Sequence, residues 1–247
     1  MTWHSEPRFG GEPLTTGRGG RLGLSVALCL LLTSFVAPIA RAAPTEQSAA
    51  ANQISVQPAA APSQADHAVE GFRSAHFGMT EQEVRKAIHE DFSVAAEAVK
   101  AGENRAERTR VLTVTVPNVL PGGGRAVVSY VFGYKTRRLI QIGITWSRET
   151  DTAITPDTLA SDSEVLREYF LHLGYAPASI ATNQPIKNGV LAFRGADDKG
   201  RETALLLLGT IHKESDKKRV LTPTALQLVY VENPKQPDIL RLRKGKF

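Results

Sequence analysis

Strict alternation of apolar and polar residues in three runs of the chain constrains its fold more than any other feature. The runs extend from Val111 to Val116, from Ala126 to Tyr134 and from Ile140 to Trp146. Alternation with a period of two places the apolar side chains of a strand on one face of a sheet and the polar side chains on the other. Because short links join the three runs, they predict an antiparallel meander with one buried face and one wetter face.

The wetter face presents small polar side chains that suit contact with a partner. Their hydroxyl and amide groups both donate and accept hydrogen bonds, and they alternate with the apolar residues along each strand. Gln227, in the predicted strand near the end of the chain, belongs to the same set. We expect six binding positions on this face: Thr113, Thr115, Ser129, Gln141, Thr145 and Gln227.

Two segments carry the start or stop signals of helices. Thr80 and Glu83 have the spacing of a capping box, in which each side chain accepts a hydrogen bond from the backbone of the other residue. Pro156 suits the first position of a helix and Gly174 suits a left-handed helix end, so we expect a second helix between them. Both helices have an apolar side, which predicts that they lie on the buried face of the sheet.

Three further strands are predicted after the second helix, at Val190 to Arg194, Thr203 to Ile211 and Thr224 to Val231. The leucines from Leu205 to Leu208 point to both faces of their strand, which predicts a central strand that is covered twice. The order of elements is therefore a helix and three strands, twice. We predict an α+β fold of antiparallel meander sheets with two helices, built either from two helix-plus-three-strand repeats or as one irregular sheet.

The N-terminal region has the pattern of an export signal. An apolar run from Leu22 to Ile39 follows Arg18 and Arg21 and precedes the sequence Ala40-Arg41-Ala42. Basic, apolar and small-residue regions in this order are typical of a secretory signal peptide, so we expect residues 1–42 to be removed on export to the periplasm or beyond. The alternative is an uncleaved membrane anchor, because the apolar run is nearly long enough to span a bilayer.

Composition divides the remaining chain into three parts. Residues 43–70 are dominated by alanine, proline, serine and glutamine, which bury too little apolar surface to offset the entropy lost on ordering. We therefore predict a disordered linker there, followed by an α+β domain over residues 71–233 and a basic tail over residues 234–247. The single cysteine, Cys29, lies in the predicted signal peptide, so no disulfide is expected in the mature chain.

Two basic clusters are candidate sites for anionic partners. One precedes the last predicted strand, and the other is the C-terminal tail, where cations alternate with apolar residues. Such a tail suits contact with anionic lipid, and the alternative is a frayed terminus in solution. The cations concerned are Lys217, Lys218, Arg219, Arg241, Arg243 and Lys244.

Several classes of function find little support in the sequence. The formal net charge of +5 includes arginines of the predicted signal peptide, so we expect no nucleic-acid partner. The histidines lack the spacing of metal ligands and no phosphate-binding glycine motif opens a helix, so we expect no metal and no cofactor. The residues from Ser215 to Lys218 match S-x-x-K but lie between strands, so we expect no catalytic residue there.

The segment from Phe77 to Val84, with the sequence FGMTEQEV, resembles the opening of small bacterial envelope proteins. It is similar to the start of the outer-membrane-assembly lipoprotein family, which implies helices combined with a three-stranded meander. Two helix-plus-meander units in tandem resemble the secreted inhibitor proteins of β-lactamases. With Leu120 to Gly124 and the Val128 to Val131 strand, the whole chain resembles uncharacterised exported proteins of α-proteobacteria, a group that implies no known activity.

These features favour a periplasmic, non-enzymatic module that binds a protein or another envelope component through the wetter sheet face. Two alternatives stay open. A hydrolase or a lipid-binding enzyme could assemble its site from distant residues, and a pocket joining His76, His89 or His172 to a carboxylate would indicate one. An inhibitor of an exported enzyme is the second alternative, and it rests on the resemblance to the β-lactamase inhibitors.

Overall fold

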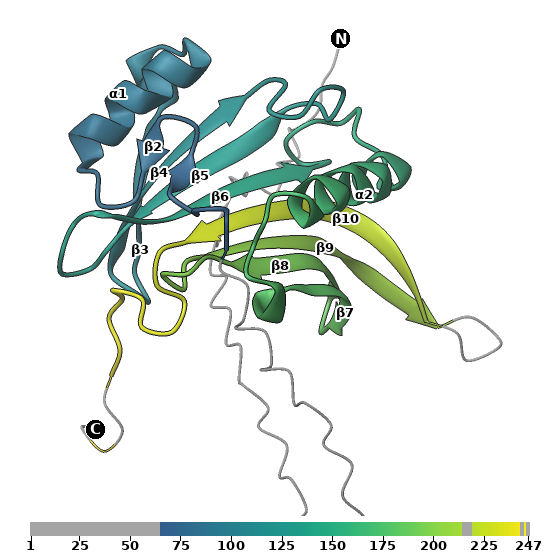
Figure 1. The fold of residues 1–247 in the computed structure, drawn as a ribbon. Coiled ribbons are helices and arrows are strands. Elements are labelled where there is room, and N and C mark those ends of the chain that lie inside the picture. The colour runs from purple at the N-terminus through teal and green to yellow at the C-terminus, as the bar shows by residue number, and fades with distance from the viewer. Residues whose placement is uncertain (1–64, 214–218, 243–244, 246–247) are drawn as a thin grey trace, which may run out of the picture.

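The computed structural model describes residues 65–213, 219–242 and 245 of the chain (Figure 1). The predicted signal peptide and most of the predicted linker lie outside these residues. Among the described residues, no helix has the length and apolar character needed to cross a membrane. Four of the basic site candidates also lie outside the described residues: Lys217, Lys218, Arg243 and Lys244.

An eight-stranded antiparallel sheet with two α-helices confirms the predicted α+β class (Figure 1). The spatial order of the strands is β3-β4-β5-β6-β10-β9-β8-β7, and a separate two-stranded hairpin precedes the first helix. The elements are β1 (Gly71–Phe72), β2 (Ala75–His76), α1 (Glu81–Phe92), β3 (Lys100–Asn104), β4 (Thr109–Val116), β5 (Ala126–Phe132), β6 (Leu139–Ser147), α2 (Pro156–Leu171), β7 (Ala181–Ile186), β8 (Gly189–Ala196), β9 (Glu202–Lys213) and β10 (Arg219–Val231), with 3₁₀ turns at Ala96–Ala98 and Pro177–Ser179.

Both halves of the chain have the same order of elements, a helix followed by four strands. Each half thus contains one strand beyond the three that the sequence predicts, and these additional strands, β3 and β7, form the two edges of the sheet. Neither edge strand has the apolar alternation of a half-buried strand: four of the five residues of β3 are exposed, and β7 contains Pro185, which cannot donate to a ladder. The two meanders form one continuous sheet because β6 pairs with β10.

Both helices and the β1–β2 hairpin cover the same face of the sheet, and the main core lies beneath them (Figure 1). Val84 and Ile88 of α1 belong to one buried cluster with Leu166 and Phe170 of α2 and with the inward-facing residues of the strands. Fully burying a side chain of this kind contributes about 1.5–3 kcal/mol relative to leaving it exposed. The shared cluster therefore couples the two halves of the chain.

The leucine run lies in β9, an interior strand between β10 and β8, and contributes to apolar clusters on both faces of the sheet. Leu205 and Leu207 pack into the main core, while Leu206 and Leu208 belong to a smaller apolar cluster on the opposite, helix-free face. Leu191, Ala204 and Val229 join that smaller cluster. The helix-free face is consequently apolar in the second half of the chain and more polar in the first half.

The helix signals are confirmed in position and geometry. The Oγ1 of Thr80 accepts from the backbone N–H of Glu83 at 3.3 Å, and the Oε2 of Glu83 accepts from the backbone N–H of Thr80 at 2.7 Å. The second helix begins at Pro156 after its N-cap residue Thr155. Gly174 lies three residues after that helix with a φ of 84°, a conformation that glycine adopts without steric cost.

The first described residues, 65–69, contact the second half of the chain. The backbone N–H groups of Asp66 and His67 donate to the carbonyl oxygen of Gly174 at 2.9 and 3.0 Å, and that of Ala65 donates to Asp198 Oδ1 at 3.0 Å. Val69 is almost fully buried in the main core. Residues 65–69 are therefore held by both backbone hydrogen bonds and apolar contact.

Candidate functional site

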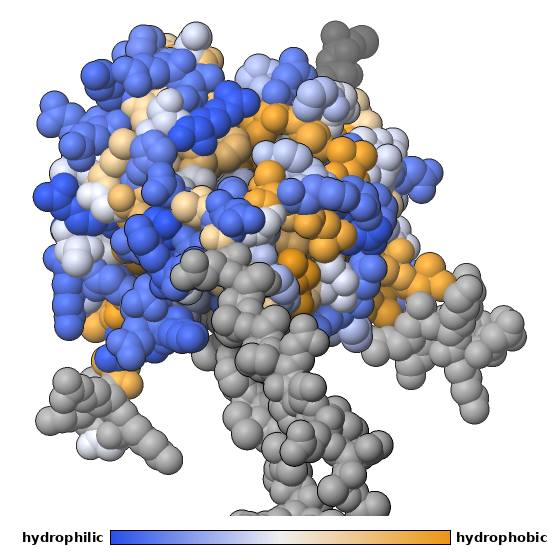
Figure 2. Space-filling model, in the orientation of Figure 1, coloured by the Kyte–Doolittle hydropathy of each residue, from blue (hydrophilic) through white to orange (hydrophobic). Residues whose placement is uncertain are grey.

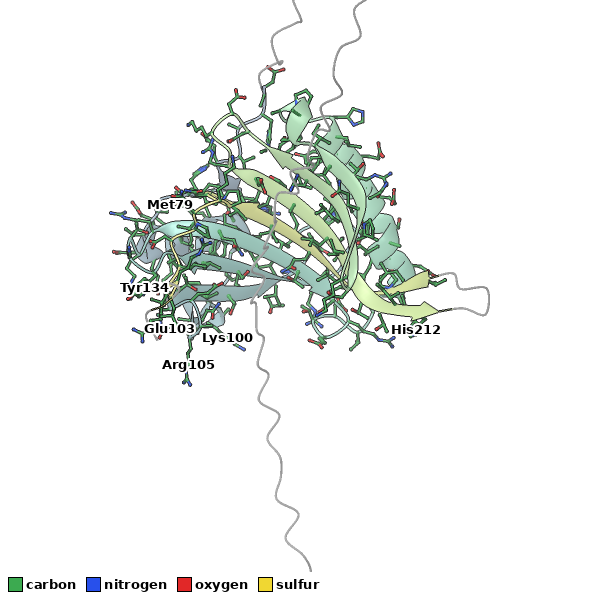
Figure 3. The ribbon with its side chains drawn as sticks, turned by 90° about the horizontal axis from the view of Figure 1, so that it is seen from below. Met79, Lys100, Glu103, Arg105, Tyr134 and His212 are labelled. Atoms are coloured by element: carbon green, nitrogen blue, oxygen red, sulfur yellow. The ribbon has the colours of Figure 1, made fainter. Side chains whose placement is uncertain are left out.

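A cavity of about 640 Å³ lies on the helix-free face, at the end of the sheet formed by the β3–β4, β5–β6 and β8–β9 turns. Figure 3 shows the molecule from below, with Arg105 and Tyr134 marking this end of the sheet and His212 the opposite end. The volume is within the usual range of ligand pockets, roughly 300–1,000 Å³. We call it the sheet cavity.

Strand register builds the floor of the sheet cavity from one row of side chains. Val111 pairs with Val131, Val131 with Gln141, and Gln141 with Val231, so the row crosses four neighbouring strands on the face opposite the main core. A register shift at the end of β5 leaves Ile140 opposite no residue of that strand, and Ile140 also lines the cavity. The floor is therefore mainly aliphatic.

The chain that follows β10 forms the roof. The backbone N–H of Glu232 donates to the carbonyl oxygen of Ile140 at 3.0 Å, and the backbone N–H of Leu240 donates to the carbonyl oxygen of Glu107 at 2.8 Å. These two bonds tie residues 232–240 to β6 and to the β3–β4 turn. The last described part of the chain thereby encloses space above the sheet.

Asp238 fixes the middle of this roof. Its carboxylate accepts from the backbone N–H groups of Lys135 and Thr136, at 3.1 and 2.8 Å, and from the Thr136 hydroxyl at 2.8 Å. Burial opposes ionisation of this carboxyl, but the hydrogen bonds outweigh burial and lower the pKa of Asp238 below its usual value. An ionised side chain thus anchors the roof to the β5–β6 turn.

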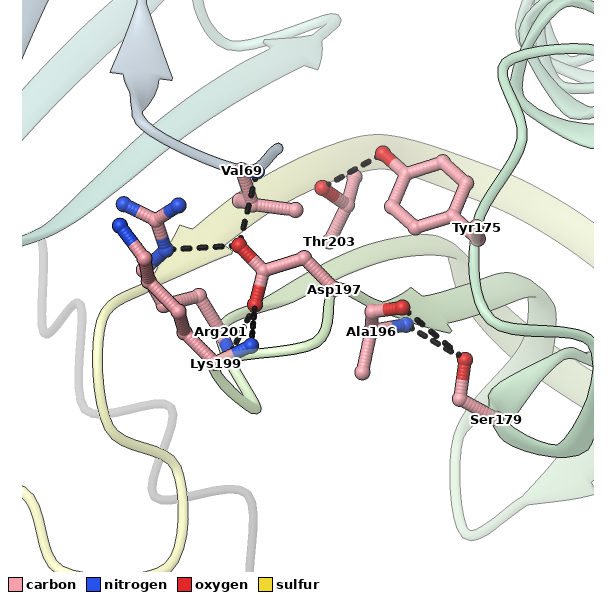
Figure 4. A network of polar contacts seen from close by, with 8 residues as sticks. All are labelled: Val69, Tyr175, Ser179, Ala196, Asp197, Lys199, Arg201 and Thr203. Carbon is pink, nitrogen blue, oxygen red and sulfur yellow. Dashed lines mark hydrogen bonds and ion pairs between the residues drawn. The ribbon is translucent and has the colours of Figure 1, made fainter. Parts of the chain in front are cut away.

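Asp197 fixes the β8–β9 turn, which forms another wall (Figure 4). Its Oδ1 accepts from the backbone N–H groups of Lys199 and Arg201, both at 2.9 Å. Its Oδ2 accepts from Arg201 Nε at 2.7 Å and from the backbone N–H of Val69 at 3.0 Å. Burial opposes ionisation, yet these bonds lower the pKa of Asp197. The turn that carries Lys199 and Arg201 to the cavity is therefore well ordered.

Charges of both signs surround the aliphatic floor. Burial raises the pKa of Glu202 and the pKa of Glu232 above their usual values. Arg138, Lys199 and Arg241 also line the cavity, so a carboxyl group and a cation are both within reach of a bound molecule. The sheet cavity combines an apolar floor with a rim that matches a polar group of either sign.

Thr109 supplies an unpartnered polar atom in the lining. Its side chain is fully buried, and its Oγ1 has no hydrogen-bond partner among the described residues. Buried hydroxyl groups without a partner are uncommon, and such an atom is satisfied by a water or a ligand group that the site admits. Thr109 thus borders the cavity with a hydroxyl that the protein encloses and that lacks a partner among the described residues.

All six polar positions expected from alternation occupy the helix-free face, but only Gln141 lines the cavity. Thr115 is exposed, and Thr113 and Thr145 are half-buried. Ser129 and Gln227 are buried, and the Ser129 hydroxyl donates to the carbonyl oxygen of Gly143 at 3.2 Å inside the sheet. The shared face thus brings the six residues into one surface without bringing them into one pocket.

Of the basic candidates, two lie within the described residues. Arg241 is exposed and lines the sheet cavity. Arg219 begins β10, in the hairpin that β9 and β10 form at the opposite end of the sheet. The structure therefore places these two candidates far apart along the sheet.

Sequence reasoning did not single out Thr109, Glu202 or Glu232. The first two continue the alternation of their strands: Thr109 is two residues before Val111, and Glu202 is two before Ala204. Extending the period of two to the strand ends would have assigned both to the helix-free face. Glu232 carried no such signal, because it lies in the irregular chain after β10.

The histidines proposed as markers of an enzyme lie outside the sheet cavity: its lining does not include His76, His89 or His172. His89 Nδ1 lies 3.0 Å from the carbonyl oxygen of Val94, and His172 Nδ1 lies 2.7 Å from that of Glu168. Within the described ranges, no group of three or more potential ligands is placed to hold a metal ion.

Comparisons with protein-family models, with curated proteins and with solved structures found no match.

Proposed function

We propose that the protein is an exported, non-enzymatic module of the periplasm that binds an envelope amphiphile, with the acyl chain in the sheet cavity. The observation that carries the proposal is the aliphatic floor beneath a charged rim. Export is supported by the signal-peptide pattern of residues 1–42. No contact among the described residues favours the hydrolase or the inhibitor alternative over this one.

An acyl chain matches the floor better than a polar ligand does. Val111, Val131, Ile140 and Val231 present branched aliphatic groups side by side, and Ala204 extends the lining toward the smaller apolar cluster. Each methylene group that moves from water to such a surface contributes about 0.8 kcal/mol. Burial of an acyl chain on the floor therefore supplies the main favourable contribution to binding, without a reactive group.

The rim favours a zwitterionic headgroup. The carboxyl groups of Glu202 and Glu232 suit an ammonium group, while Arg138 and Arg241 suit a phosphate. A headgroup with both charges satisfies more of these groups than an anionic or a neutral headgroup.

The test is calorimetric titration of the full chain with dodecanoyl lysophosphatidylethanolamine, kept below its critical micelle concentration. The variant Val231→Trp fills the floor and is expected to weaken binding about ten-fold or more, which corresponds to about 1.4 kcal/mol. Thr115→Trp is the matched control, because Thr115 is exposed on the same face outside the cavity lining. It should bind as the parent protein does.

Two results would overturn the proposal. One is the absence of binding by the parent protein. The other is equal affinity for the parent protein and Val231→Trp, since a chain on the floor cannot tolerate an indole there. Dodecanoyl lysophosphatidylglycerol, which lacks the ammonium group, is expected to bind more weakly than the ethanolamine probe, and tighter binding of it would refute the role given to the rim carboxyls.

A further inference from the structure

A second cavity, of about 310 Å³, lies on the opposite face of the sheet, between α2, β1 and the chain that follows β4. Figure 2 shows apolar residues at the surface of this side of the molecule, over the sheet between the two helices. The volume is near the lower limit for ligand pockets, which is about 300 Å³, so it suits a small molecule. We call it the helix-side cavity, and its ligand is separate from the one proposed above.

Aromatic rings dominate its walls. Phe72 and Tyr230 lie nearly parallel with ring centroids 6.0 Å apart, and Tyr169 meets Phe170 edge-on at 5.3 Å. Trp146 also lines the cavity. Flat faces and edges at these separations accept another ring in offset or edge-to-face contact, with about 0.5–1.5 kcal/mol per ring pair beyond the apolar area buried.

Trp146 adds a donor without a partner. The residue is 1% exposed, and its Nε1 has no hydrogen-bond partner among the described residues. A buried indole N–H normally finds an acceptor. Among the described residues, Trp146 is thus a wall residue of the cavity whose N–H lacks a partner.

Arg73 sets the charge at the same cavity. Its guanidinium lies over the rings of Phe72 and Phe92, with centroid distances of 5.5 and 4.7 Å, and its Nη1 donates to the backbone oxygen of Asp91 at 3.1 Å. The Asp91 carboxylate instead accepts from Ser74, and no carboxylate of the described chain forms an ion pair with Arg73. The guanidinium therefore has its charge available for an anion.

His67, the other titratable base in the lining, does not duplicate this role. Burial lowers the pKa of His67, although Asp197 opposes that effect. The imidazole is thus largely neutral at pH 7 and presents an apolar ring to the cavity, against the ring of Tyr175 at 4.6 Å. Arg73 is the cation that decides the charge preference of the site.

We propose that the helix-side cavity binds a small aromatic acid, with its ring system among Phe72, Phe170 and Tyr230. The anionic group pairs with Arg73, and the ring system extends along the wall that includes Trp146. Geometry, ring chemistry and charge select the same class of molecule: one or two fused rings that carry a carboxylate.

The test compares 2-naphthoate with the neutral 2-naphthalenemethanol by calorimetric titration of the full chain. We expect naphthoate to bind about ten-fold more tightly than the alcohol. Arg73→Gln should remove that preference and leave alcohol binding unchanged, whereas Arg73→Lys, which keeps the cation, should retain a preference for naphthoate. Trp146→Phe keeps an aromatic ring but makes this wall smaller, so it should weaken the binding of naphthoate and of the alcohol alike.

Controls separate this site from the sheet cavity. Arg138→Gln and Val231→Trp alter only the lining of the sheet cavity, and both should leave naphthoate binding unchanged. The proposal is overturned if the parent protein binds neither compound, or if it binds both equally. It is also overturned if Val231→Trp abolishes naphthoate binding while Arg73→Gln and Trp146→Phe do not change it. None of these outcomes bears on the acyl-chain proposal.

Discussion

Two carboxyl groups, Asp197 at the start of the β8–β9 turn and Glu202 at the first position of β9, have different roles. Asp197 is buried among four donor groups and ionises readily, so it serves the turn. Glu202 lies on the cavity wall, and burial raises its pKa. The same side-chain chemistry therefore stabilises the fold at one position and remains available for a ligand at the other.

Replacement of Asp197 by asparagine is expected to destabilise the protein by about 3 kcal/mol, because Arg201 then loses its partner in a buried pair and an amide cannot accept all four bonds. Urea unfolding at pH 7 measures the change. Asp198→Asn, at the exposed neighbouring position, should cost less than about 1 kcal/mol. Equal losses for the two variants would contradict the role given to the Asp197 network.

Glu202→Gln is expected to stabilise the protein at pH 7 and to have less effect at pH 4. The folded state raises the pKa of Glu202 above its ordinary value of 4.5, so the folded chain binds this proton more tightly than the unfolded chain. The free energy of unfolding therefore falls as pH rises from about 4.5 through the raised pKa of Glu202. Thermal unfolding at both pH values checks this, with the exposed Glu149→Gln as control. A stabilisation that is equal at both pH values would refute it.

At the scale of elements, signals within a short stretch of sequence predicted three strands and both helices of the fold. The two edge strands, which depend on pairing with a neighbouring strand, were not predicted. Alternation located β4, β5 and β6, and cap residues located both helices, because these signals lie within a few residues. The edge strands β3 and β7 carry no alternation, and each forms because a neighbouring strand offers an open ladder. Their polar or proline-containing sequences suit sheet edges, which must not pair with other chains.

Thr80→Ala is expected to cost about 1 kcal/mol, since it removes the side-chain acceptor for the backbone N–H of Glu83 at the start of α1. The loss should be local: hydrogen exchange of the first turn of α1 increases, while that of α2 does not. Thr158→Ala, in the first turn of α2, is the control that leaves the α1 cap intact. Unchanged stability in Thr80→Ala would show that the capping box contributes nothing measurable.

At the scale of the whole molecule, the shared face was predictable and the cavity was not. The period of two assigned Gln141 and its five companions to the helix-free face, where the structure places them. The roof, however, depends on bonds between Leu240 and Glu107 and between Asp238 and Thr136, which join residues far apart in the chain. No local pattern encodes such closures, and so the rim residues Glu202 and Glu232 were not recognised as one site.

The continuous sheet predicts one cooperative unfolding transition for the two halves. β6 and β10 pair along seven residues on each strand, from Gln141 to Ser147 and from Ala225 to Val231, and one buried cluster includes residues of both helices. Urea unfolding followed by far-ultraviolet circular dichroism and by Trp146 fluorescence in a Trp3→Phe background should give coincident transitions. Two separated transitions would mean that the halves are independent domains.

The amide chemical-shift map of the protein during titration with dodecanoyl lysophosphatidylethanolamine tests whether the acyl chain binds in the sheet cavity. We predict that the largest changes fall on Val131, Ile140, Ala204, Val231 and the roof residues 232–240, and that they disappear in Val231→Trp. Changes centred instead on β1 and α2, or spread evenly over the surface, would contradict binding in the sheet cavity.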